Sequence, residues 1–104
     1  MAFINGPVPE SFERRVTATP REFERDLRQA WPQVQVQGGA DASALGLQDG
    51  TQHLAIEIEP AGLRRLGLLE LPQLIVRYRF GAGTEPARRA LLERLDRAMQ
   101  KGGG

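Results

Sequence analysis

Few side chains in this chain have types and spacings suited to catalysis, and Glu57 and Glu59 form the clearest pair. If they lie on a strand, both carboxylates point to one face, about 6.5 to 7 Å apart, a separation compatible with paired-carboxylate hydrolysis. The side chains expected opposite them include arginines, which lower a carboxylate pKa where a general acid needs a raised one. A salt-bridged sheet surface is therefore the preferred interpretation.

The other chemically competent residues occur singly. His53 is the only histidine, on the outward side of a predicted strand, with no second histidine to complete a metal site. Ser43 and Tyr78 are hydroxyls without an evident base. The absence of cysteine excludes disulfides, thiol catalysis and zinc–thiolate sites. The sequence thus nominates no catalytic residue, no metal site and no cofactor, and we do not expect an enzyme.

Length and composition predict one soluble domain. The chain has 104 residues and a formal net charge of +1, with arginines and carboxylates interleaved, so charge alone indicates no particular partner. Its apolar runs are much shorter than the ~20 residues of a spanning helix, and the N-terminus lacks the pattern of a secretory signal. We expect a cytoplasmic protein without a membrane partner.

Two segments have the alternation typical of half-buried strands. In residues 73–80, Leu74, Val76, Tyr78 and Phe80 share one face, and in residues 52–59, Leu54, Ile56 and Ile58 do so. Between them, residues 63–70 carry leucines on both parities. Turns at 60–62 and 71–73 would make that segment a strand of its own.

This arrangement predicts a register. It sets Leu54 opposite Leu68, Ile56 opposite Leu66 and Glu57 opposite Arg65. Asp49-Gly50 predicts a hairpin turn before the first of these strands, which sets Leu45 opposite Leu54 and Ser43 opposite Ile56. The result is a four-stranded antiparallel meander.

The flanking segments predict two helices and further strands. Residues 11–18 alternate as an opening strand, and Thr19 begins a capping box that ends with Glu22, so a helix starts there. Pro32 ends that helix, and Val34 to Gln37 is a candidate edge strand. Thr84 caps a second helix. Residues 1–10 are predicted to be a flexible arm, 11–101 one α+β domain, and 102–104 a flexible tail.

The predicted fold is an antiparallel sheet of about five strands in the order β-α-β-β-β-β-α, with both helices on one sheet face. This order resembles the helix-grip and TATA-binding-protein-like architectures over about residues 11 to 101. The resemblance rests on element order without a diagnostic motif, so it implies no activity. A ferredoxin-like fold is the alternative, disfavoured because the chain ends in a helix.

The uncovered sheet face is the predicted binding surface. Its small residues, which include Ala55 and Gly67, would make a trough. An apolar strip of Leu69 and Ile75, facing each other on neighbouring strands, would lie beside it, with charged side chains on the other edge. The hypothesis is that a second copy, the chain's own Phe3 and Ile4, or another protein fills this trough. The candidate residues are Ala55, Glu57, Arg65, Gly67, Leu69, Ile75, Arg77 and Arg79.

Binding of a small ligand and binding of nucleic acid are the two alternative functions. A small apolar or anionic ligand would need a pocket between the sheet and the C-terminal helix, and the apolar residues are numerous enough to fill that space. Arg65, Arg77 and Arg79 suggest nucleic acid, but Tyr78 and Phe80 point inward, so aromatic side chains for stacking on bases are missing from the outer face. A protein-interaction or homodimerisation module ranks first.

Overall fold

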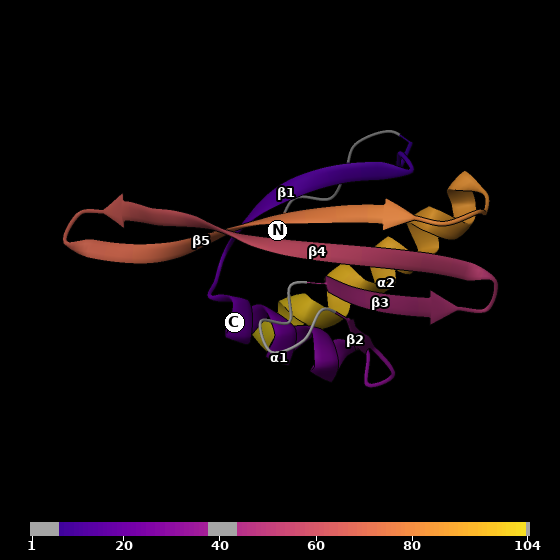
Figure 1. Cartoon of the computed structure of the whole chain (residues 1–104), viewed down its shortest axis with the longest axis horizontal. Coiled ribbons are helices and arrows are strands. Elements are labelled where there is room, and N and C mark those ends of the chain that lie inside the picture. Colours follow the sequence, from indigo (N-terminus) through magenta and orange to yellow (C-terminus); the bar gives the residue numbers. More distant parts are fainter. Residues whose placement is uncertain (1–6, 38–43, 104) are drawn as a thin grey trace.

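Strand pairing arranges the chain into an antiparallel sheet with two helices on one side (Figure 1). The computed structural model describes residues 7–37 and 44–103. Within them the sheet order is β1-β5-β4-β3-β2, and the α+β class predicted from the sequence is confirmed. The elements are β1 Ser11–Thr17, α1 Pro20–Ala30, β2 Gln35–Gln37, β3 Ala44–Asp49, β4 Gln52–Leu66, β5 Leu69–Phe80 and α2 Glu85–Gly103.

The sheet has a buried inner face and an exposed outer face. Side chains of one parity on β4 and β5 are buried, as predicted: Leu54, Ile56, Ile58, Leu74, Val76, Tyr78 and Phe80. They pack in one cluster with Phe23 and Leu27 of α1 and with Leu91, Leu92 and Leu95 of α2. Both helices therefore cover the inner face, while β4 and β5 point their other parity toward solvent.

The structure contradicts the prediction that residues 63–70 form a separate strand. β4 continues through Pro60 to Leu66, and only Gly67 and Leu68 separate it from β5. Leu54 therefore pairs with Phe80 rather than Leu68. The predicted turns at 60–62 and 71–73 are wrong, and the meander consists of β2, β3, β4 and β5.

Edge positions explain why prolines occur inside these strands. β3 pairs with β4 only as far as Glu57, and β1 pairs with β5 only as far as Gln73. Beyond those points, in the described residues, β4 and β5 pair with each other alone, and proline is tolerated in such edge segments. The register shifts between Pro60 and Leu63, and pairing resumes at Leu63–Pro72. Gly62 within this irregularity has φ 86°, a conformation that glycine adopts readily.

The leucines at the end of this hairpin lie outside the core. Leu66 and Leu68 were predicted on the core face, but they are 47% and 103% exposed. The hairpin extends past the rest of the sheet, and neither helix covers its end (Figure 1). We call Leu63, Leu66, Leu68 and Leu69 the leucine tip.

The turn between β3 and β4 lies one residue later than predicted. Asp49 pairs with Gln52, which leaves Gly50 and Thr51 as the turn. Leu54 therefore pairs with Leu47, not Leu45. Because the shift changes the pairing by two positions, the same leucines stay on the inner face. The predicted partner of Ile56, Ser43, lies outside the described residues; Leu45 occupies that position.

Both helices begin at the predicted caps. The Thr19 hydroxyl accepts from the Glu22 amide at 3.1 Å, and the Glu22 carboxylate accepts from the Thr19 amide at 2.9 Å. The Thr84 hydroxyl accepts from the Ala87 amide at 3.2 Å. Trp31 is the C-cap of α1, directly before Pro32. The candidate strand at 34–37 is present as β2 at the sheet edge.

Two residues of the predicted flexible arm, Val8 and Glu10, contact the domain. Val8 is buried in the core, its amide donates to Glu85 at 2.7 Å, and its carbonyl accepts from Arg88 at 3.0 Å. The Phe80 amide donates to the Glu10 carbonyl at 2.7 Å. Phe3 and Ile4 lie outside the described residues, and α2 extends to Gly103, into the predicted tail.

Neither described helix has the length and apolarity that crossing a membrane would require.

The capping box predicts the effect of Thr19→Ala. Loss of the hydroxyl leaves a helix N–H without its partner, so the free energy of unfolding should fall by about 1 kcal/mol. Urea denaturation followed by circular dichroism measures this change. Thr51→Ala in the exposed β3–β4 turn is the matched control and should alter stability by less than about 0.5 kcal/mol. Equal midpoints for the two variants would refute the role of the cap.

The hairpin register predicts a contrast between two large-to-small substitutions. Ile56→Ala removes a fully buried side chain, so it should destabilise the fold by about 2–5 kcal/mol. Leu68→Ala removes a fully exposed one and should change stability by less than about 0.5 kcal/mol. The same denaturation experiment measures both, and a Leu68→Ala variant as unstable as Ile56→Ala would place the hairpin end in the core.

Candidate interaction surface

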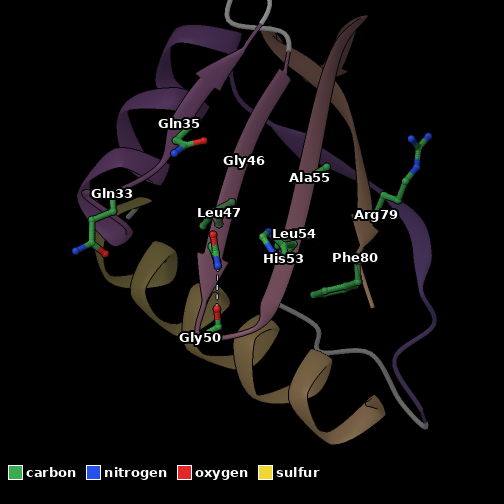
Figure 2. Close-up of a pocket in the computed structure, with 12 residues that line it drawn as sticks. Gln33, Gln35, Gly46, Leu47, Gly50, His53, Leu54, Ala55, Arg79 and Phe80 are labelled. Carbon is green, nitrogen blue, oxygen red and sulfur yellow. Dashed lines mark hydrogen bonds between the residues drawn. The ribbon is translucent and has the colours of Figure 1, made fainter. Parts of the chain in front are cut away.

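A hollow of about 630 Å³ opens on the outer face where β2, β3, β4 and β5 lie side by side. One cross-strand row runs through it, from Gln35 to Gly46, Ala55 and Arg79. Figure 2 shows Gly46 and Ala55 on neighbouring strands, with the Arg79 side chain extending away from the sheet. The floor of the hollow lies close to the backbone, because glycine has no side chain and alanine has only a methyl group.

Polar side chains surround this floor. Gln33 and Gln35 line one side, His53 the end near Gly81, and Arg79 the opposite side (Figure 2). The Gln48 amide lies at the same end and donates to the Gly50 carbonyl at 3.0 Å. The hollow therefore combines a small apolar floor with hydrogen-bonding groups and one cation, which suits a side chain from a partner better than covalent chemistry.

A band of ion pairs crosses the outer face next to this hollow. Arg77 contacts Glu59 at 2.9 Å and Glu13 at 3.4 Å, and Arg79 contacts Glu57 at 3.8 Å. The hydrogen bond to Glu59 raises the pKa of Arg77. The predicted pairing of Glu57 with Arg65 is wrong, because Arg65 contacts Glu70 near the hairpin end. These exposed pairs contribute little to stability individually.

The structure divides the predicted binding residues into two groups. Ala55, Glu57, Ile75, Arg77 and Arg79 share the outer face of the sheet. The other three, Arg65, Gly67 and Leu69, lie on the hairpin end.

The predicted apolar strip beside the trough is therefore not formed as expected. Leu69 and Ile75 were expected to face each other across two strands. They are six residues apart on β5, or about 20 Å along an extended strand. The trough that the structure shows has Gly46 and Ala55 as its floor, without Gly67.

A second hollow, of about 440 Å³, lies at the base of the leucine tip. Arg15, Thr17 and Gln73 line it from β1 and β5, together with Ala61, Leu63 and Arg64 of β4. The Gln73 amide donates to the Thr17 hydroxyl at 2.8 Å. Neither Arg15 nor Arg64 was among the predicted binding residues, and the predicted turn at 60–62 directed the segment that holds Arg64 back along the sheet.

A buried ion pair on the inner face was also missed. Arg14 donates to both carboxylate oxygens of Asp96, at 2.8 and 3.1 Å, and Asp96 is only 3% exposed. The guanidinium lies over the rings of Phe12 and Tyr78, with its Cζ 5.4 and 5.2 Å from their centres. The pair joins β1 to α2 beneath the sheet. Its one sequence signal was an arginine on the apolar parity of residues 11–18.

The described residues contain no cluster of histidine and carboxylate side chains suited to a metal ion. Comparison with known proteins found no matching family model, curated protein or solved structure. Function is therefore inferred from the surfaces themselves.

Tyr78 provides a pH-dependent test of the inner-face cluster. Burial raises the pKa of its phenol above the usual value near 10, because the ionised form would lose its hydration. The folded state thus keeps a proton that the unfolded state releases. The resulting stability is complete below about pH 10 and is lost as pH rises through the folded-state pKa.

Tyr78 is the only tyrosine, so ultraviolet absorbance of tyrosinate reports its ionisation alone. We expect a midpoint above that of the urea-unfolded chain, and we expect Tyr78→Phe to lose stability less steeply above about pH 10. Coinciding midpoints for folded and unfolded protein would show that Tyr78 is accessible to water.

Proposed function

We propose that this chain is a protein-interaction module whose outer sheet face receives a partner. The observation that carries the proposal is the hollow with a floor of Gly46 and Ala55 on a face that neither helix covers. An antiparallel sheet can leave one face in water, yet polar side chains usually cover such a face. Here four strands contribute to an opening with no large side chain at its centre.

The chemistry of the hollow defines what fits there. A small or medium apolar side chain would fill the space above Gly46 and Ala55. A carboxylate beside it would be attracted to Arg79, whose 3.8 Å contact with Glu57 is long and solvent-exposed and therefore costs little to replace. Gln33 and Gln35 supply amides for the partner's backbone. These features favour an acidic segment with an apolar side chain, from a second copy or from another protein.

Two other functions have weaker support. A ligand pocket between the sheet and α2 would need space where Leu91, Leu92 and Leu95 are buried against the core. Nucleic-acid binding would need free cations and exposed rings, whereas Arg77 and Arg79 contact carboxylates and Tyr78 and Phe80 are buried.

We also propose that the fold is a small variant of the helix-grip and TATA-binding-protein-like architectures. The support is that β1 lies beside β5, and that both helices cover the inner face. The likeness concerns architecture and adds no activity.

Ala55→Arg tests the proposed docking face. The new side chain would fill the hollow and exclude the partner's apolar side chain, so association should weaken at least tenfold, while stability should change by less than about 0.5 kcal/mol because Ala55 is exposed. Sedimentation equilibrium over a range of concentrations measures self-association, and pull-downs from the native extract measure other partners.

Ala90→Arg is the matched control, because Ala90 is exposed on α2 and the substitution adds the same charge away from the outer face. The proposal requires the control to behave as the wild type. It fails if the wild type stays monomeric and all three proteins recover the same partners.

A further inference from the structure

The exposed apolar side chains of this protein are concentrated at one end. Leu63, Leu66, Leu68 and Leu69 are the large hydrophobic residues that remain exposed in the described chain, and seven consecutive positions contain them all. They lie on the part of the β4–β5 hairpin that projects beyond the sheet (Figure 1). An apolar group of this kind on a soluble surface usually marks a contact site.

The leucines project from both faces of the hairpin. Leu66 and Leu69 are paired across the strands and share one face. Leu63 is paired with Pro72 and lies three residues from Leu66, so it points to the other face. Leu68 lies in the turn. A flat protein surface would cover the leucines on only one of these faces. A fluid apolar layer that surrounds the tip would cover the leucines on both faces and in the turn.

Two arginines lie on the side of the leucine tip that is nearer to the rest of the sheet. Arg15 and Arg64 line the hollow at the base of the tip. In the described structure neither makes an ion pair, although Arg65, Arg77 and Arg79 all do. Thr17 lies in the same hollow and accepts a hydrogen bond from Gln73, which leaves its hydroxyl proton available to donate. Two guanidinium groups and a hydroxyl are well suited to a phosphate group.

We propose that the hairpin end docks on an anionic lipid surface, with the leucine tip among the upper acyl chains and Arg15 and Arg64 at the lipid phosphates. The spacing supports the placement of Arg64, and Arg15 lines the same hollow farther from the turn. Arg64 precedes the turn residue Leu68 by four positions, or about 13 Å along an extended strand. Interfacial segments bury their apolar side about 5–10 Å into the boundary between headgroups and acyl chains, which leaves Arg64 at headgroup level.

The same geometry limits the depth of insertion. At the tip, β4 and β5 pair only with each other, so their outer edges carry backbone groups that need water or headgroup partners. The contact is therefore peripheral, unlike that of a helix that spans the bilayer. The expectation of no membrane partner followed from apolar run length and from placing these leucines in the core.

Vesicle co-sedimentation tests the proposal. The full chain should bind vesicles of phosphatidylcholine mixed with phosphatidylglycerol and bind phosphatidylcholine alone much more weakly. Arg15→Gln and Arg64→Gln should each weaken binding to the anionic vesicles about fivefold. Arg97→Gln removes the same charge from an exposed position on α2 and should have a smaller effect.

Substitutions at the tip separate insertion from simple charge attraction. Leu68→Ser with Leu69→Ser should weaken vesicle binding about tenfold or more without altering the unfolding midpoint, because both residues are exposed. In Leu68→Trp, fluorescence should shift to shorter wavelength when anionic vesicles are added. The native Trp31 is already buried and should contribute little to that shift.

Three results would overturn the proposal. The first is the absence of wild-type binding to anionic vesicles at low ionic strength. The second is binding that the leucine substitutions leave unchanged. The third is a lipid-independent dimer that dissociates on Leu68→Ser with Leu69→Ser, since the tip would then be an interface between copies. Failure here leaves the outer-face proposal intact, because Ala55 lies in the other hollow.

Discussion

The continuous pairing of β4 with β5 determines which surfaces this protein presents. From Leu54–Phe80 to Pro60–Leu74 the ladder keeps one register, and after the irregularity it resumes at Leu63–Pro72. The first part places a column of apolar side chains under the two helices. The second part extends beyond the helices, so its leucines stay exposed among the residues that the structure describes. Core, outer face and leucine tip all follow from this one ladder, and a slip of one residue would exchange the two faces.

The types of side chain on the outer face change along its length. At one end the small side chains of Gly46 and Ala55 form a hollow, and beside it the pairs of Arg77 and Arg79 with carboxylates neutralise the middle. Farther along, Arg15 and Arg64 lie in a hollow and make no ion pair within residues 7–37 and 44–103. The two proposed contacts therefore use opposite ends of the face.

Local patterns predicted the parts of the fold that local physics controls. Strand alternation identified the inner faces of residues 52–59 and 73–80, and the Thr19–Glu22 capping box located the start of α1. Proline and glycine at 60–62 were interpreted as a turn, because they rarely occur inside a strand. Only the pairing partners show that this segment is an edge. The same error placed Leu66 and Leu68 in the core, so the leucine tip was not predicted. The Arg14–Asp96 pair joins residues 82 positions apart, and the position of Arg14 on the apolar parity of its strand does not identify the partner.

Solution NMR tests the hairpin register most directly. Nuclear Overhauser effects between backbone protons identify which residues pair across antiparallel strands. The observed register predicts contacts that join Leu54 to Phe80, Ile58 to Val76, and Leu66 to Leu69. Contacts between Leu54 and Leu68, or between Leu66 and Tyr78, would contradict it, because they would fold the hairpin end back onto the sheet and remove the leucine tip.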